Sequence, residues 1–136
     1  MLEEWLLYRE QIQNSKDNLI GADLSTAKLM RIDLSNGNLS QADLSCAYLI
    51  RANLSGANLQ DADLSDAVLS EANLTEANLE GADLTDTYLN GADLRGAKNL
   101  TCDQVEFAII DKDTKFPDYM KIVWDADGNF ECEEQP

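Results

Sequence analysis

Histidine is absent from this sequence, and only ten of its 136 residues are lysine or arginine. The missing imidazole removes the side chain that most often acts as general base, triad member or metal ligand near neutral pH. No run of 18 apolar residues occurs, so we expect no membrane span and no membrane partner. The N-terminus lacks the basic segment of a signal peptide, which argues against export. We therefore expect a protein that is not an enzyme and that binds no cofactor.

Cysteine is also sparse, because Cys46, Cys102 and Cys132 are the only three. An odd, small set is more typical of reduced thiols in a cytoplasm than of a disulfide framework. A bridge between Cys102 and Cys132 is possible in principle, but the sequence does not establish it. The cysteines therefore indicate a cytoplasmic protein.

Leucine, by contrast, occupies every fifth position at sixteen consecutive sites from Leu19 to Leu94. On an α-helix a step of five rotates by about 140°, which would scatter the leucines around the cylinder. On a flat strand an odd step would send alternate leucines to opposite faces. The period suits only a chain that turns once per repeat and brings each leucine back inside, which is a solenoid.

The residues around each leucine describe the repeat. A small residue, usually alanine, stands two positions before the leucine, and Asp or Asn usually lies between them. In an extended segment the alanine and the leucine share the inward face, and the residue between them faces water. The other two positions are mostly polar or glycine, which suits a corner. Each repeat is thus one short edge and one turn.

The outward residues before the leucines recur with a period of 20 residues. Three of the four resulting columns contain only Asp and Asn, and one of them is Asp23, Asp43, Asp63 and Asp83. The fourth column is Lys28, Tyr48, Val68 and Tyr88. Four edges therefore make one coil, and the repeats predict four coils that stack to a rod of about 19 Å.

Tandem motifs carry a family resemblance. GADLS at 21–25, QADLS at 41–45 and EANLT at 71–75 resemble the pentapeptide repeat proteins, whose motif is Ala-(Asp/Asn)-Leu-x-x. The resemblance covers residues 18–98 and is typical of a small bacterial, cyanobacterial-type member. It implies an all-β solenoid, a right-handed quadrilateral parallel β-helix. One branch of the family protects DNA gyrase by imitating the duplex.

Both ends of such a coil need covering, because its edges and leucine core would otherwise be exposed. We expect residues 1–17 to form a short N-terminal capping helix and linker before the β-helix of residues 18–98. The apolar residues expected to lie on the first coil are Leu2, Trp5, Leu6 and Ile12.

Residues 99–136 are expected to form a small C-terminal helix and loop cap with an acidic tail. Thr101 and Gln104 have capping-box spacing, which predicts a short helix to about Ile110. Further along, Asp127-Gly128 suits a small hairpin or a loop packed on the last coil, with order uncertain after about Asp118. The Asp-x-Asp-Gly run superficially resembles a calcium loop, but it lacks the bidentate Glu, so we interpret it as a turn. No metal ligands or catalytic residues are predicted.

Acidic residues are abundant, with 26 Asp and Glu and a net charge of −16. Such a chain repels nucleic acid directly and favours basic partners. The candidate acidic surface is Asp61, Asp63, Asp66, Glu71, Glu76, Glu80, Asp83 and Asp86. It supports the alternative function of an acidic DNA mimic that binds a DNA enzyme such as gyrase. Stacked aspartates should also repel one another, which predicts raised pKa values unless N–H groups bond to them.

The apolar column supports the leading hypothesis. Aromatic and branched side chains that stack along a sheet stabilise it by about 0.2–1 kcal/mol per pair, which alone is a sufficient reason for the column. It is also the only apolar stripe offered to a partner, and exposed apolar area is typical of an interface. We therefore predict a non-catalytic protein-interaction or scaffold module that is a monomer or weak homodimer. The candidate interaction face is Met30, Tyr48, Ile50, Val68 and Tyr88.

Overall fold

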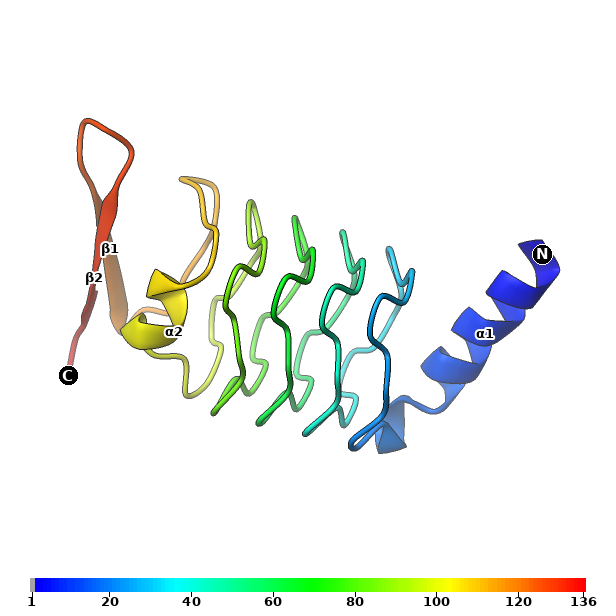
Figure 1. Cartoon of the computed structure of the whole chain (residues 1–136). Helices are drawn as coiled ribbons and strands as arrows, with labels where there is room; N and C mark the ends of the chain where they lie inside the picture. The colour runs from blue at the N-terminus through cyan, green and yellow to red at the C-terminus, as the bar shows by residue number, and fades with distance from the viewer. Residues whose placement is uncertain (1) are drawn as a thin grey trace.

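The structure, a computed structural model, describes residues 2–136. Its elements are helix α1 (Leu2–Asn14), the 3-10 helix η1 (Lys16–Asn18), helix α2 (Cys102–Glu106) and strands β1 (Met120–Trp124) and β2 (Phe130–Glu134). Between η1 and α2 the chain winds into a stack of turns, with α1 at one end and the β1–β2 hairpin at the other (Figure 1). Within residues 2–136, no helix combines the length and the apolar character needed to cross a bilayer.

Successive turns of the coil are joined by parallel bridges between residues 20 apart, such as Asp23 to Asp43 and Tyr48 to Val68. Each edge is too short to form an extended strand and contributes one bridging residue per turn. That residue donates its N–H to the turn before, as Asp43 does to Ala22 at 2.9 Å. The leucine after it donates to the turn that follows, so the 20-residue period predicted from the outward residues is confirmed.

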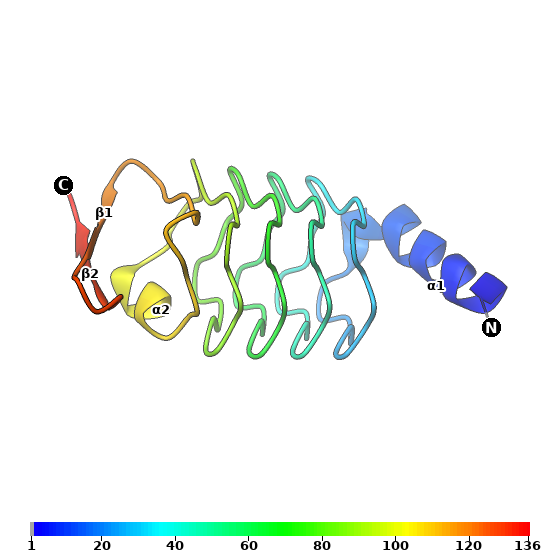
Figure 2. The ribbon, with the colours of Figure 1, turned by 90° about the horizontal axis from the view of Figure 1, so that it is seen from above.

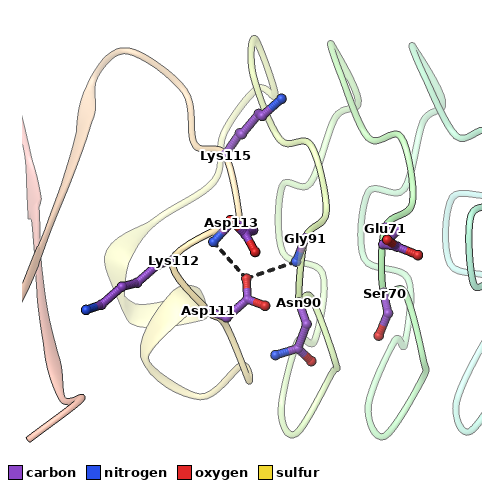
Figure 3. A pocket seen from close by; sticks show the side chains of 8 residues that line it. All are labelled: Ser70, Glu71, Asn90, Gly91, Asp111, Lys112, Asp113 and Lys115. Carbon is purple, nitrogen blue, oxygen red and sulfur yellow. Dashed lines mark hydrogen bonds between the residues drawn. The ribbon is translucent and has the colours of Figure 1, made fainter.

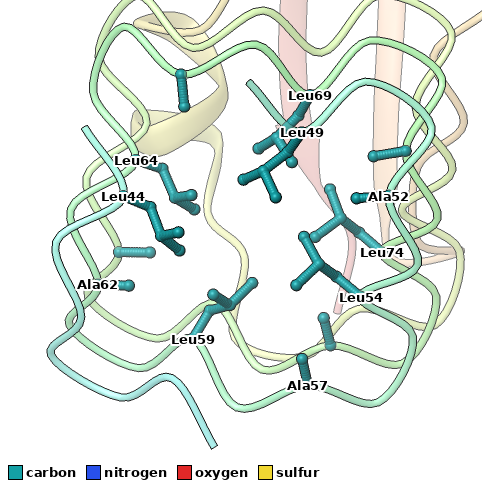
Figure 4. Close-up of a cluster of buried hydrophobic side chains, with 14 of the residues drawn as sticks. Leu44, Leu49, Ala52, Leu54, Ala57, Leu59, Ala62, Leu64, Leu69 and Leu74 are labelled. Atoms are coloured by element: carbon teal, nitrogen blue, oxygen red, sulfur yellow. The ribbon is translucent and has the colours of Figure 1, made fainter. Parts of the chain in front are cut away.

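Leucine fills the centre of the coil. Each turn contributes four leucines that point inward in one layer, as Figure 4 shows for Leu44, Leu49, Leu54 and Leu59. All four have no exposed surface. The alanines line the wall between them (Figure 4). The inward assignment of leucine and alanine is confirmed.

The corners share one turn geometry. The N–H of the small inward residue donates to the carbonyl of the preceding leucine, as Ala42 does to Leu39 at 3.0 Å. The residue before it has a positive φ, for example 60° at Gln41 and 69° at Gly81. A positive φ at the third position of a four-residue turn is the mark of a type II turn. The corner positions therefore favour glycine, asparagine and aspartate, which tolerate this conformation best.

Helix α1 confirms the predicted N-terminal helix but not its predicted packing. Ile12 is only 6% exposed, whereas Leu6 is 46% exposed, and the side chain of Leu2 lies outside the described residues. The helix leaves the first turn at an angle and extends beyond it (Figures 1 and 2). It touches the coil through its second half, where Gln13 accepts the N–H of Asp33 at 3.1 Å. The prediction that Leu6 covers the first coil is wrong.

At the other end the chain makes one more turn without the repeat motif. Thr101 and Gln104 form both arms of the predicted capping box at the start of α2. The helix ends at Glu106, earlier than the predicted Ile110, and Phe107 is its C-cap. Leu100 and Val105 continue the buried column. The chain then rejoins the ladders, because Ile109 pairs with Tyr88 and Lys115 pairs with Asp93.

The hairpin closes the C-terminal end. Strands β1 and β2 are antiparallel, with Met120 opposite Glu134 and Trp124 opposite Phe130. The turn between them is held by Asp125, whose carboxylate accepts the N–H groups of Asp127 and Asn129 at 2.9 Å. This confirms the hairpin and the turn interpretation, and shows order beyond Asp118.

A disulfide joins Cys102 at the start of α2 to Cys132 in β2. The expectation of reduced thiols is therefore wrong for these two residues, although Cys46 is free and exposed. The reason is tertiary, because the hairpin folds back and brings the Cα atoms to 5.5 Å. Disulfides persist mainly in oxidising surroundings, so the cysteines no longer favour a cytoplasm.

Candidate interaction faces

Two adjacent faces of the coil differ in what they present to solvent. The aspartate face carries Asp23, Asp43, Asp63 and Asp83 on consecutive turns. The aromatic face carries Lys28, Tyr48, Val68, Tyr88 and Ile109 on consecutive turns. Both faces have the same backbone bonds between turns, so the difference lies only in the outward side chains.

On the aspartate face each carboxylate stabilises its own corner. The Oδ1 atoms accept the N–H of the residue two positions later, at 2.9–3.1 Å. At Asp23 the hydroxyl of Ser25 also donates, at 2.6 Å. The Ser25 hydroxyl and then its N–H lower the pKa of Asp23 below its ordinary value of 3.8. The pKa of Asp23 is thus lowered and not raised, because the Ser25 donors outweigh desolvation; this is the exception allowed in the prediction for carboxylates that accept N–H groups.

The aromatic face lacks this hydrogen bond from the outward side chain to the N–H two residues later. Lysine, tyrosine and valine do not accept the N–H two residues on. The N–H groups of Met30, Ile50, Ser70 and Asn90 have no acceptor among residues 2–136. Of the predicted face, Tyr48 and Tyr88 are 45% and 43% exposed. Val68 and the corner residues Met30 and Ile50 are half-buried. The structure thus places the five predicted residues on one side of the coil. Tyr48, Val68 and Tyr88 lie on three consecutive turns, and Met30 and Ile50 lie at the adjoining corner.

Two residues of this face were missed by the sequence analysis. Ile109 continues the ladder after Tyr88 and is 36% exposed, and Phe107 at the neighbouring corner is 63% exposed. Ile109 lies 21 residues after Tyr88, so the 20-residue period would not have found it. The signal is structural, because the N–H of Ile109 donates to the carbonyl of Thr87 at 2.8 Å.

The acidic residues are not spread evenly. Asp63 and Asp83 lie on the aspartate face itself, and the two corners beside it carry four more of the predicted set, namely Asp61, Glu80, Asp66 and Asp86. Glu71 and Glu76 lie on the other two corners. The aspartate face and the two corners beside it are here called the aspartate side. With Asp23 and Asp43, the aspartate side carries eight carboxylates and no lysine or arginine on the four repeat turns.

The corner that follows the aromatic face, here called the charged corner, changes sign along the coil. Its residues on successive turns are Arg31, Arg51, Glu71, Gly91 and Asp111. Arg51 Nε lies 2.8 Å from Glu71 Oε2, which pairs two neighbouring turns. Asp111 Oδ1 accepts the N–H of Gly91 at 3.0 Å. Arg31 has no partner among the described residues.

Comparisons with known proteins match the repeats. The family of pentapeptide repeats matches in eight copies, over residues 33–70 and 62–98. A pentapeptide repeat protein, Rfr23, from the cyanobacterium Cyanothece 51142 is 35% identical, with a TM-score of 0.65 over 74% of this chain and 67% of that chain. A search of curated proteins found no match.

Two further solved structures are similar over less of their own length. HetL from the cyanobacterium Nostoc sp. PCC 7120, involved in the regulation of heterocyst differentiation, is 37% identical with a TM-score of 0.57 over 71% of this chain and 44% of that chain. QnrB1, a plasmid-mediated fluoroquinolone resistance protein, is 21% identical with a TM-score of 0.61 over 73% of this chain and 50% of that chain. At that identity QnrB1 shows likeness of fold alone.

Proposed function

The chain belongs to the pentapeptide repeat family, whose members form right-handed quadrilateral β-helices, and from that premise we propose a non-catalytic module that binds a protein through its aromatic face. The architecture proposed with it has four repeat-encoded coils, with α1 at one end and residues 99–136 as a cap at the other. The similarity to HetL, a protein described by a regulatory role, is consistent with a binding function.

One observation carries the proposal. On the other ladders an Asp or Asn oxygen bonds the following corner, and such a bond contributes roughly 0.5–1.5 kcal/mol. The aromatic face lacks it after Lys28, Tyr48, Val68 and Tyr88 and exposes apolar surface in return. Stacking along the column offsets about 0.2–1 kcal/mol of that loss per pair, but residues that break a local rule are also expected at functional sites. A contiguous exposed apolar stripe is also the usual mark of an interface.

The test replaces both tyrosines of the stripe. Tyr48→Asp with Tyr88→Asp restores the residue type of the aspartate face, including a carboxylate that can accept the corner N–H. We expect unchanged circular dichroism and equal or higher stability, because the core is untouched. Capture of protein partners from a lysate of the source organism should fall by about tenfold or more, which corresponds to about 1.4 kcal/mol. Unchanged capture by the double variant would refute the aromatic face as the binding surface.

A second candidate function, an acidic mimic of DNA that binds a DNA enzyme, is favoured by the aspartate side. Its eight carboxylates lie on the aspartate face and the two corners beside it, where residues 20–26, 40–46, 60–66 and 80–86 include no lysine or arginine. A duplex of about 19 Å carries about eleven charges, so the charge density is of the same order. Binding of this kind should weaken steeply with salt, whereas binding through an apolar stripe should not.

The matched variant for this candidate is Asp61→Asn, Asp66→Asn and Asp86→Asn. All three residues have a positive φ near 57°, which Asn tolerates, and their carboxylates make no hydrogen bond or ion pair in the described part of the chain. The triple variant therefore removes three charges without disturbing a corner. If it loses partner capture while the double Tyr variant keeps it, the DNA-mimic function replaces the leading proposal.

A further inference from the structure

The aromatic face and the charged corner together have a self-complementary pattern. Along the face, Val68 is the middle of five rungs, with Tyr48 on one side and Tyr88 on the other. Along the charged corner, Arg31 is at one end and Asp111 at the other. A pattern that is symmetric in shape and opposite in charge about its centre matches itself when it is reversed.

We propose that the aromatic face binds a second copy of this chain, with the two coils antiparallel and a two-fold axis at Val68. This inference rests on the proposed function and names its partner. An isologous two-fold contact pairs the same patch on both copies. With the axis in the plane of the face and perpendicular to the coil, the charged corner of one copy lies along the charged corner of the other.

That arrangement brings matching groups together. Tyr48 of one copy lies against Tyr88 of the other, and the two Val68 side chains meet on the axis. Arg31, whose guanidinium has no partner among residues 2–136, lies against Asp111 of the second copy. Both contacts occur twice, because the axis repeats them.

The surface also has a hollow at the place where Arg51 of the second copy would project. An open hollow of about 650 Å³ lies over Gly91, between Glu71 and the loop that holds Asp111 and Asp113. In the antiparallel pair, Arg51 of the second copy lies opposite Gly91, where no side chain occupies the space. Lys112 and Lys115 border the same hollow, but their ammonium groups point away from Gly91 (Figure 3).

The alternative orientation with parallel coils is much less favourable. It would place Lys28 on Lys28 of the second copy and Glu71 near Asp66, so like charges would meet. In the antiparallel pair the two Glu71 residues meet near the axis, but each carries its own Arg51 at 2.8 Å. The two Asp66 residues meet at the other corner, which leaves one like-charge contact, against two Glu71–Asp66 contacts and the Lys28 pair in the parallel orientation. The charge pattern therefore selects the antiparallel orientation.

The pair should be weak. Five rungs extend over about 19 Å of one narrow face. The area that each copy would bury is therefore well below the roughly 800 Å² per partner of a stable interface. We expect sedimentation equilibrium to give a mass near the 15.1 kDa of the monomer in dilute solution, rising toward twice that value as concentration increases. The rise should be smaller in high salt, because the corner contacts are screened.

A charge exchange tests the orientation. Arg31→Glu and Asp113→Lys are two separate variants, and neither wild-type side chain makes a hydrogen bond or ion pair with the residues that the structure describes. Glutamate is tolerated at such a corner, because Glu71 has the same positive φ of 58°. Asp113 is chosen over Asp111, whose carboxylate holds the N–H groups of Gly91 and Thr114. Each variant alone should dimerise about tenfold more weakly, because Arg31→Glu places like charges together at both ends and Asp113→Lys adds a base beside the Asp111 that faces Arg31.

An equimolar mixture of the two variants should recover the wild-type dimerisation constant to within about threefold, since both end contacts become attractive. A mixture no tighter than either variant alone would overturn the antiparallel pair. A second measurement uses cross-linking in a Cys46→Ser background, with Val68→Cys on the axis and Asn58→Cys on the opposite side as control. A thiol cross-linker spanning about 10 Å, the spacing of packed sheets, should join only the Val68→Cys variant. Equal cross-linking of both variants would also overturn it.

The failure of this inference differs from failure of the proposed function. If the wild-type chain stays monomeric at every concentration while Tyr48→Asp with Tyr88→Asp still abolishes capture of a host protein, the aromatic face binds a different protein. If the chain dimerises through Val68 and captures no host protein, the second copy is its occupant. If neither occurs, both proposals fail.

Discussion

The repeat coil of residues 19–98 and the terminal segment of residues 99–136 form the same ladders by different means. In the coil, every turn has four leucines and four corners with a positive φ, and the inward residue after each corner is almost always small. In the terminal segment only the bridges at Ile109 and Lys115 follow that pattern. A capping box, a disulfide and the side chain of Asp111 replace the repeat motif there. The last turn therefore takes its path from the turn before it, whose N–H and C=O groups it must satisfy.

The largest expected effect is in the coil. Leu64 has no exposed surface, so Leu64→Ala should lower the free energy of unfolding by about 2–5 kcal/mol through lost burial and a cavity. Ser65→Ala is the control, because it removes only the hydroxyl bond to Asp63 and should cost at most about 1 kcal/mol. Chemical denaturation of both variants provides the measurement, and equal destabilisation would contradict the inward role of the leucines.

The terminal segment should respond to loss of its disulfide. Cys102→Ser with Cys132→Ser releases a link across 30 residues, which should favour opening of the segment by about 3–4 kcal/mol. Hydrogen exchange should then lose protection in β1 and β2, while the amides of the coil keep theirs. Uniform loss of protection across both regions would show that the two unfold as one unit. The single variant Cys46→Ser is the control, because Cys46 is free and exposed.

Gly37 marks the place where the first turn departs from the repeat. Alanine is usual at this position, yet a Cβ on Gly37 would lie 2.9 Å from the carbonyl oxygen of Leu34 and 3.0 Å from that of Lys16. Gly37→Ala should therefore destabilise the fold by about 1–3 kcal/mol through overpacking. Gly21→Asn is the control, because nothing lies within 4 Å of its Cβ position and Asn tolerates its positive φ. A rise in melting temperature for Gly37→Ala would show that the backbone of η1 moves aside.

The smallest effect is that of pH, and it acts on both regions. Serine hydroxyl and N–H donors lower the pKa of Asp23 and Asp33 in the coil. At Asp111 burial raises the pKa, but the donors of Gly91, Asp113 and Thr114 outweigh it and lower the pKa overall. A lowered folded-state pKa stabilises the fold fully above the ordinary value of 3.8, and this contribution is lost as pH falls through the folded-state value.

Melting temperature should accordingly stay level between pH 7 and pH 5 and fall below about pH 4. Asp23→Asn with Asp33→Asn should flatten part of that fall, because Asn accepts the same corner bond without titrating, as Asn53 does from Ser55. A melting temperature that rises on acidification below pH 4 would mean that repulsion among the carboxylates dominates after all.

Much of the fold and part of the candidate sites could be predicted from the sequence. The five-residue period assigns Leu64 and its equivalents to the interior, and the 20-residue period places Tyr48, Val68 and Tyr88 on one face. The capping-box spacing of Thr101 and Gln104 predicts the start of α2. These features are local or strictly periodic. Each repeat contacts only its neighbours, so the sequence of one repeat predicts the structure of all of them.

The tertiary structure decided the rest. After Leu100 the helix α2 changes the spacing, so only the backbone bonds of Thr87 and Leu89 bring Ile109 into the aromatic face. The bridge from Cys102 to Cys132 depends on the hairpin folding back, which no spacing in the sequence states. Once the repeat ends, contacts between distant residues determine the path of the chain, because each group must find a partner on a surface that the preceding turn has already built.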